Sequence, residues 1–119
     1  MPAMNNLERE KEWLLREKHG GVESDAYRDD VARLESGEPV DYVIGFSQFL
    51  GCRIDLSHRT LIPRTETEYW VDIAIKELTE KYGREAKLQM LDIFSGSGCI
   101  GVAVLKHFPN ATIDFVDIE

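Results

Sequence analysis

The sequence has few of the residues that metal centres, disulfide frameworks and membrane spans need. Its 119 residues include two cysteines and three histidines, and no pair of them has the spacing of a metal site: Cys52, Cys99, His19, His58 and His107. We therefore expect no metal site, and two reduced, buried thiols in a cytoplasmic protein. No apolar run approaches the roughly 18 residues of a membrane-spanning helix, and residues 1–6 lack the features of a signal peptide.

Positive charge is also scarce. The chain has 14 Lys and Arg against 22 Asp and Glu, a formal net charge of −8. A nucleic-acid-binding surface needs Lys and Arg to replace the counterions of the phosphates, so we expect no direct nucleic-acid contact. Hydrophobic residues make up 43% of the chain, which excludes a disordered tail. This length allows one domain, or a small domain and part of a second.

Apolar residues at helical spacing predict two short helices at the start of the chain. The first begins after Asn5 or Asn6 and ends before Gly20-Gly21, and the second runs from Ser24 to Ser36-Gly37. Both carry many charges, so we expect a small helical unit over residues 1–37. Residues 46–50 and 53–57, on either side of Gly51-Cys52, predict a β-hairpin within a linker, residues 38–63, because the second arm alternates polar and apolar residues as a half-buried strand does.

A third helix is predicted over residues 65–82, ending at Gly83. Thr65 and Glu68 fit the S/T-x-x-E capping box, in which each side chain accepts a hydrogen bond from the other residue's backbone N–H. The face expected to define its packing consists of Trp70, Ile73, Ala74, Glu77 and Leu78.

The last part of the sequence reads as strand, turn, helix and strand, over residues 88–93, 94–98, 99–107 and 112–117. Such a unit normally forms two parallel strands with a crossover helix. We therefore expect residues 64–119 to be the first βαβ unit of an α/β, Rossmann-like, doubly wound domain that is truncated. Its unpaired sheet edges favour self-association or pairing with a complementary chain.

The turn after the first of these strands carries the strongest functional signal. Small residues there allow a ligand to approach the backbone closely, and the N–H groups of the first helical turn point toward it. Asp117, at the end of the next strand, is placed to accept hydrogen bonds from ribose hydroxyls. The pattern predicts a nucleoside site, although the glycines by themselves are also compatible with a tight turn and nothing more.

Two cofactors compete for this site. Residues 96–101 match the dinucleotide fingerprint G-x-G-x-x-G. Asp92, however, precedes the glycines, and its charge would repel a pyrophosphate but attract the sulfonium and ammonium groups of S-adenosylmethionine. We therefore favour S-adenosylmethionine over a nicotinamide dinucleotide.

A second segment, Leu61–Glu68, has an ordinary and a functional interpretation. The ordinary one is a capped helix start after a proline-containing loop, with solvated charges. The functional one is that this rigid start presents Arg64 and Glu66 to a pocket.

Four segments, in this order, resemble the release factor glutamine N(5)-methyltransferases: Gly37–Gly45, Phe49–Gly51, Leu61–Glu68 and Leu91–Ile100. The resemblance covers about residues 37–119 and implies an enzyme that transfers a methyl group from S-adenosylmethionine to the glutamine of the Gly-Gly-Gln loop of peptide chain release factors. It implies a cofactor site formed by Asp92, Phe94, Ser95, Gly96, Ser97, Gly98, Asp117 and Ile118, with Asp117 on the ribose and Ile118 beside the adenine. It also implies that Arg64, Glu66 and Thr67 line the substrate cleft.

The sequence departs from the family pattern in three places. Phe94 stands where the family usually has glycine, and Thr65 where it usually has a second proline. The catalytic Asn-Pro-Pro-Tyr signature is absent, so we assign no catalytic residue and expect this N-terminal portion to be inactive alone. Three alternatives remain open: a nucleic-acid adenine methyltransferase of the same superfamily, an NAD-binding Rossmann domain, and a non-enzymatic truncated module.

Overall fold

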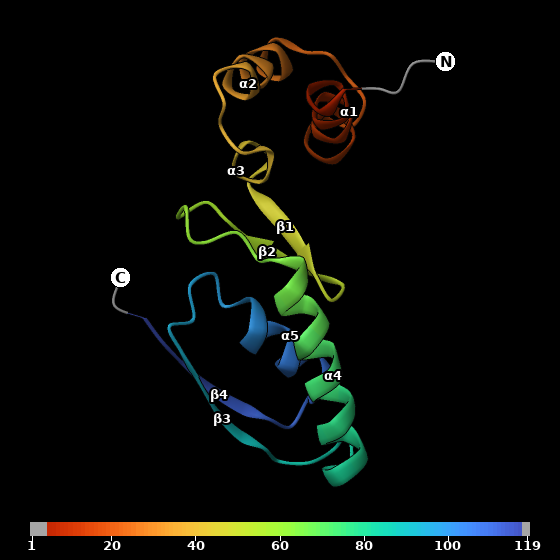
Figure 1. Cartoon of the computed structure of the whole chain (residues 1–119), viewed down its shortest axis with the longest axis vertical. Helices are drawn as coiled ribbons and strands as arrows, with labels where there is room; N and C mark the ends of the chain where they lie inside the picture. The colour runs from red at the N-terminus through yellow and green to blue at the C-terminus, as the bar shows by residue number, and fades with distance from the viewer. Residues whose placement is uncertain (1–4, 118–119) are drawn as a thin grey trace. The chain divides into compact units, whose positions relative to one another are not determined.

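The computed structural model describes residues 5–117. The chain divides into two compact units, Met1–Phe46 and Ser47–Glu119, and each is described by itself (Figure 1). Within the described residues, no helix combines the length and the apolar character that crossing a bilayer requires.

The first unit consists of helices α1 (Asn6–His19), α2 (Asp25–Glu35) and α3 (Val40–Ile44). The predicted cap of α1 is confirmed, since Asn5 accepts a hydrogen bond from the backbone N–H of Glu8. Ser24, the predicted start of the second helix, caps α2 by accepting a hydrogen bond from the backbone N–H of Tyr27. Gly20 ends α1 in the left-handed conformation, with a φ of 60°. The buried core of this unit is formed by Leu14, Tyr27, Leu34, Val40, Val43, Ile44 and Phe46.

Helix α3 is not anticipated by the sequence reading. Its five residues are too few to show a helical period, and they were assigned to the linker. Val40, Val43 and Ile44 nevertheless are buried in the core with α1 and α2. Packing of these three side chains therefore accounts for a helix that local propensity does not predict.

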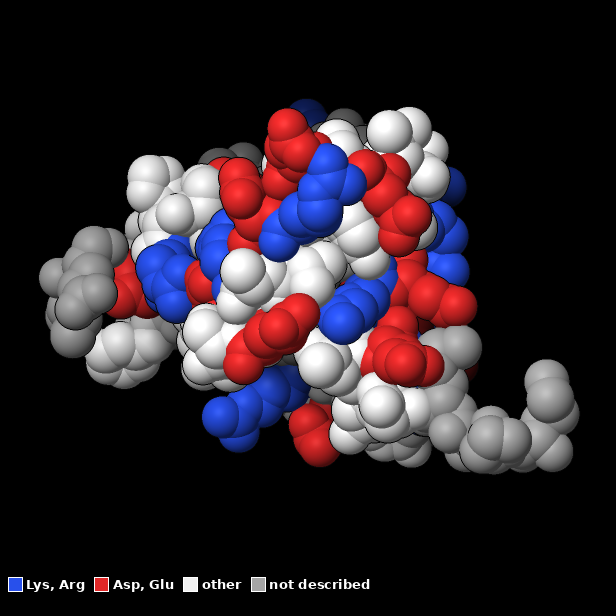
Figure 2. Space-filling view, turned by 90° about the horizontal axis from the view of Figure 1, so that it is seen from above, with Lys and Arg blue, Asp and Glu red and all other residues white. Residues whose placement is uncertain are grey.

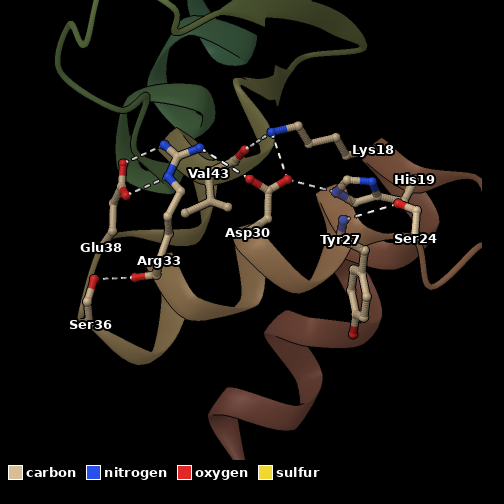
Figure 3. A network of polar contacts seen from close by, with 9 residues as sticks. All are labelled: Lys18, His19, Ser24, Tyr27, Asp30, Arg33, Ser36, Glu38 and Val43. Atoms are coloured by element: carbon tan, nitrogen blue, oxygen red, sulfur yellow. Dashed lines mark hydrogen bonds and ion pairs between the residues drawn. The ribbon is translucent and has the colours of Figure 1, made fainter.

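A buried carboxylate joins the three helices (Figure 3). Asp30 on α2 lies 2.7 Å from Nε2 of His19, 2.9 Å from Nζ of Lys18 and 3.3 Å from the Arg33 guanidinium. Lys18 also donates a hydrogen bond to the Val43 carbonyl on α3, at 2.8 Å. Burial by itself would raise the pKa of Asp30, but the hydrogen bonds and charges of Lys18 and His19 outweigh it and hold that pKa below its ordinary value of 3.8.

The hairpin consists of β1 (Phe46–Phe49) and β2 (Cys52–Asp55). The turn was expected at Gly51-Cys52 but lies one residue earlier, because Leu50 and Gly51 adopt the positive φ values, 47° and 78°. Two central residues with positive φ form the turn type that matches the twist of a two-residue hairpin. Cys52 is therefore the first residue of β2, and its side chain is buried.

Helix α4 (Thr65–Tyr82) has the predicted bounds, but its predicted cap is wrong. Arg64 is the capping residue and makes no side-chain cap hydrogen bond. Instead of turning back to Thr65, the Glu68 carboxylate accepts a hydrogen bond from the backbone N–H of Leu50, at 2.9 Å. The hairpin turn thus takes the acceptor that the capping box would have used.

The predicted face of α4 is also only partly right. The fully buried side chains are Val71 and Ile75, whereas Trp70, Ile73 and Glu77 are exposed. The two buried residues are one turn apart and contribute to a core with Phe49, Cys52, Ile54, Cys99, Ala103, Val104 and Phe108. The position of this core, rather than the size of Trp70, selects the buried face.

Strands β3 (Gln89–Ile93) and β4 (Thr112–Val116) pair in parallel, with α5 (Cys99–His107) between them in the chain. The register runs from Gln89 opposite Thr112 to Ile93 opposite Val116, which confirms the predicted strand–helix–strand order. Side chains that alternate along β3 lie on opposite faces of the sheet. Leu91 and Ile93 share an exposed face with Val116.

The other face of this sheet packs against α5 through a close approach between a glycine and a ring. A Cβ at Gly101 would lie 2.2 Å from Cε1 and 2.5 Å from Cζ of Phe115. Because real Cβ atoms essentially never lie so close to another atom, the packing of α5 against β4 as it stands here favours glycine at position 101, and any larger residue would have to displace the Phe115 ring. The third glycine of the G-x-G-x-x-G pattern therefore has a packing role.

Candidate functional site

The candidate site is the turn of residues 94–98, which leads from β3 into α5. Phe94, Gly96 and Gly98 have positive φ values of 58°, 56° and 79°. The backbone N–H of Ser95 donates to the carbonyl of Val116, at 3.1 Å, so the turn is joined to the end of β4. Nothing lies within 4 Å of the place where a Cβ of Gly96 would be, and the space beside the turn is therefore open to a ligand.

Asp117 faces this turn. One of its carboxylate oxygens accepts a hydrogen bond from the backbone N–H of Gly96, at 2.6 Å. The structure thus brings together the acid after β4 and the glycines after β3, as the spacing predicts. Ile118, expected beside the adenine, lies outside the described residues.

Asp92 lies on another side of the turn. Its carboxylate accepts a hydrogen bond from the backbone N–H of Gly101, at 3.2 Å, and so anchors the first turn of α5 to β3. The side chain lines an apolar groove of about 360 Å³ along β3, together with Trp70 and Ile93. Contact between Asp92 and a cofactor stays a prediction.

A pocket of about 160 Å³ lies between the turn and the start of α4. Of the two residues named by the functional interpretation of this segment, Arg64 lines the pocket, whereas Glu66 is exposed and does not. Thr67, which the resemblance implies is in the substrate cleft, also lines it. The remaining lining residues are Leu61, Ile62, Pro63, Phe94, Ser95, Gly96, Ser97, Cys99 and Ile100.

A second pocket, of about 330 Å³, lies beside the same turn. It is lined by residues 95–98 together with Val102 and Phe115, which the sequence analysis did not assign to a site. Val102 follows Gly98 by four residues, which places the two on the same face of α5. This spacing is the sequence signal that could have assigned Val102 to the pocket. The residues of the turn therefore contribute to two pockets.

The thiol at the start of α5 is buried. Burial raises the pKa of Cys99 above its ordinary value, and the charge of Asp92 acts in the same direction. A raised pKa disfavours the thiolate, which is the nucleophilic form, and Cys99 packs in the hydrophobic core of the second unit. Both Cys52 and Cys99 are free and buried, as predicted.

Within residues 5–117, the face of the molecule drawn in Figure 2 has no patch of basic side chains. Acidic and basic side chains lie interspersed there, rather than gathered by sign. Among the described residues, no three His, Cys, Asp or Glu side chains come together in a way that would hold a metal ion.

Comparison with known proteins places these features in a family context. No family model matches the chain. The release factor glutamine methyltransferase of Flavobacterium psychrophilum is 40% identical over 89 residues, which are 75% of this chain and 31% of that relative. The enzyme of the same name from Koribacter versatilis is 39% identical over 93 residues, 78% of this chain and 32% of the relative.

Similarity to one relative covers all of this chain. The release factor glutamine methyltransferase of Bordetella pertussis is 36% identical over 122 aligned positions, which cover 100% of this chain and 44% of the relative. The predicted resemblance to the release factor glutamine methyltransferases is confirmed. The chain spans about a third of the length of the first two of these relatives. All three of these relatives are named methyltransferases.

Proposed function

We propose that the chain is part of an S-adenosylmethionine-dependent enzyme that methylates the glutamine side chain in the Gly-Gly-Gln loop of peptide chain release factors. The single observation that carries this proposal is 36% identity to a release factor glutamine methyltransferase over the complete sequence. The arrangement of Asp117 at the turn supports a nucleoside cofactor. A cytoplasmic location, where release factors act, accords with this substrate.

The residues of the turn fit such a cofactor. Asp117 is placed to accept hydrogen bonds from ribose hydroxyls, and Ser95 to Gly98 offer a backbone without bulky side chains in the open space beside the turn. Arg64 and Thr67 form the opposite wall of the smaller pocket. S-adenosylmethionine would supply an activated methyl group, and these residues would bind and orient it.

The fold proposed for the complete enzyme is a doubly wound, Rossmann-like domain that begins in the second unit. We place the helical unit at residues 1–37, the linker at 38–63 and the start of the methyltransferase domain at 64–119. The parallel β3–α5–β4 unit supports this layout because it is the repeating element of doubly wound sheets.

Catalysis requires groups that this sequence does not contain. A glutamine amide nitrogen is a poor nucleophile because its lone pair is delocalised into the carbonyl. Paired acceptors have to orient it in line with the methyl group and the sulfur. The Asn-Pro-Pro-Tyr signature that would supply them in the family is absent from the 119 residues. We expect this chain to bind the cofactor weakly and to transfer no methyl group by itself.

Titration of the isotopically labelled chain with S-adenosylhomocysteine, followed by amide NMR, tests the proposed site. We expect the Ser95, Gly96, Ser97 and Gly98 amides to shift, and Asp117→Asn to weaken binding by about tenfold or less, the loss of one charge-assisted hydrogen bond. The matched control is Asp114→Asn on β4, whose exposed side chain lies outside both pockets.

Two outcomes would contradict the proposal. Shifts of the same amides with NAD but not with S-adenosylhomocysteine would assign the site to a dinucleotide. Methylation of DNA rather than of a release factor by the complete enzyme would assign it to the adenine methyltransferases. Robust release factor methylation by the 119-residue chain would refute the proposed need for the missing acceptors.

We also propose that the unpaired edges of the β3–β4 sheet associate with a second copy or a complementary chain. In the described part of the chain, β3 and β4 have only each other as neighbours, and Leu91, Ile93 and Val116 leave one face apolar and exposed. Open parallel edges and apolar faces of this kind favour further pairing. Sedimentation showing a well-folded monomer at high concentration would contradict this proposal.

A further inference from the structure

Neither backbone conformation nor burial explains why position 94 holds a phenylalanine. Phe94 is the first residue of the turn, with a φ of 58°, in the left-handed region that is unfavourable for a residue with a Cβ. Its side chain is 75% exposed, so packing within the described chain compensates little of that cost. A strained, exposed aromatic residue at a ligand-binding turn indicates that the ring has a task there.

Phe94 is one of the residues that line the 160 Å³ pocket, whose charge distribution is one-sided. Among the described residues that line this pocket, Arg64 is cationic and none carries a carboxylate. Asp92, two residues before Phe94, instead lines the groove along β3. Glu66 and Glu68 do not line the pocket either. The pocket therefore offers a guanidinium to a ligand carboxylate, but no anionic side chain to a ligand cation.

The face of an aromatic ring supplies the missing attraction. Its quadrupole places negative potential over the ring face, which attracts a cation within about 6 Å of the ring centre. We propose that Phe94 binds the positive sulfonium of S-adenosylmethionine through its ring face, and that this contact makes the pocket prefer the sulfonium cofactor to its uncharged thioether product. This inference rests on the proposed function, because it assumes the cofactor assigned there.

The test compares the affinities of the 119-residue chain for S-adenosylmethionine and S-adenosylhomocysteine, measured by the same NMR titration. In the wild type we expect the sulfonium ligand to bind about two- to fivefold more tightly through this contact, the range of an exposed cation–π pair. Phe94→Leu keeps the apolar bulk and the Cβ but removes the π-face, so it should reduce the ratio by that factor with little effect on the thioether. Phe94→Tyr keeps the π-face and should retain the ratio.

The outcomes separate this inference from the proposed function. If both ligands bind and Phe94→Leu leaves their affinity ratio at the wild-type value, the role of the ring is refuted while the cofactor site stands. If neither ligand shifts the turn amides of the wild-type chain, both proposals fall. A Phe94→Leu variant that weakens both ligands equally would show a merely apolar contact and would also overturn the inference.

Discussion

The close approach of Gly101 and Phe115 predicts a mutation whose effect changes sign with its background. In the wild type, Gly101→Ala places a Cβ 2.2 Å from the Phe115 ring, so the ring or the helix has to move. In a Phe115→Ala background that obstacle is gone, and the same substitution acts only on the helix. We therefore expect Gly101→Ala to destabilise the second unit in the first case and to stabilise it in the second.

The magnitudes follow from two opposing effects. Overpacking of a close contact costs about 1–3 kcal/mol, and Phe115 falls within this range because its side chain is 43% exposed and has space to turn outward. Replacing glycine by alanine in a helix gains up to about 1 kcal/mol. Gly101→Ala should therefore lower the free energy of unfolding by about 1 kcal/mol in the wild type and raise it by up to about 1 kcal/mol in the Phe115→Ala background. The difference, about 2 kcal/mol, is the coupling energy between positions 101 and 115.

Urea unfolding monitored by the NMR signals of the second unit measures this cycle. Signals resolved by residue are needed because the chain divides into two compact units, and a chain with more than one such unit does not have to unfold in a single transition. Gly20→Ala, at the left-handed end of α1, should destabilise only the first unit, so unchanged signals from the second unit in this variant control for a general effect on the chain. A stabilising Gly101→Ala in the wild type, or the same change in both backgrounds, would refute the assigned packing role.

Two further predictions concern hydrogen bonds outside the site. Glu68→Gln should lower the free energy of unfolding of the second unit by about 1 kcal/mol, because the Leu50 amide loses a charged acceptor. The control Glu66→Gln should change it by less than about 0.5 kcal/mol. Equal effects of the two substitutions in urea unfolding would contradict the Glu68–Leu50 contact. Because the pKa of Asp30 is lower in the folded state, its stabilisation of the first unit is complete above its ordinary value of 3.8 and is lost as the pH falls through and below that value. Asp30→Asn should remove that part of the acid sensitivity, and an unchanged loss of stability as the pH falls from about 4 to about 2 would contradict it.

The elements that the sequence predicted best are those fixed by local chemistry. Asn5 caps α1, Ser24 starts α2 and Gly20 ends α1 as expected, because each acts on backbone groups within a few residues. The strand–turn–helix–strand order at the end of the chain was predictable for the same reason: its glycines and its apolar runs alternate within about thirty residues.

The errors arise where a distant segment competes for a local group. Glu68 was expected to cap its own helix, but the Leu50 amide, eighteen residues earlier, takes its carboxylate. Helix α3 forms because Val40 and Val43 complete a core supplied by two other helices. Neither interaction leaves a periodic signal, and both require knowledge of which segments meet in space.

The candidate site shows the same division between local and distant causes. Residues 94–98 were recognisable because their glycines need positive φ, and Asp117 because an acid follows the next strand. The division of the lining residues between two pockets was not predictable, since it depends on where the start of α4 and the Phe115 ring lie.

The geometry around α5 also explains why the glycine pattern alone does not identify a cofactor. Gly96 and Gly98 provide positive φ at the turn, and Gly101 allows the Phe115 ring to pack against the helix. Asp92 accepts its hydrogen bond from the Gly101 amide, an interaction that any strand–helix unit gains from, whichever nucleoside it binds. The roles of these glycines and of Asp92 are needed to join a helix to a parallel sheet. We therefore expect the choice between cofactors to depend on side chains that make no contribution to this packing. Phe94 fits that description, because it is strained, exposed and in the pocket.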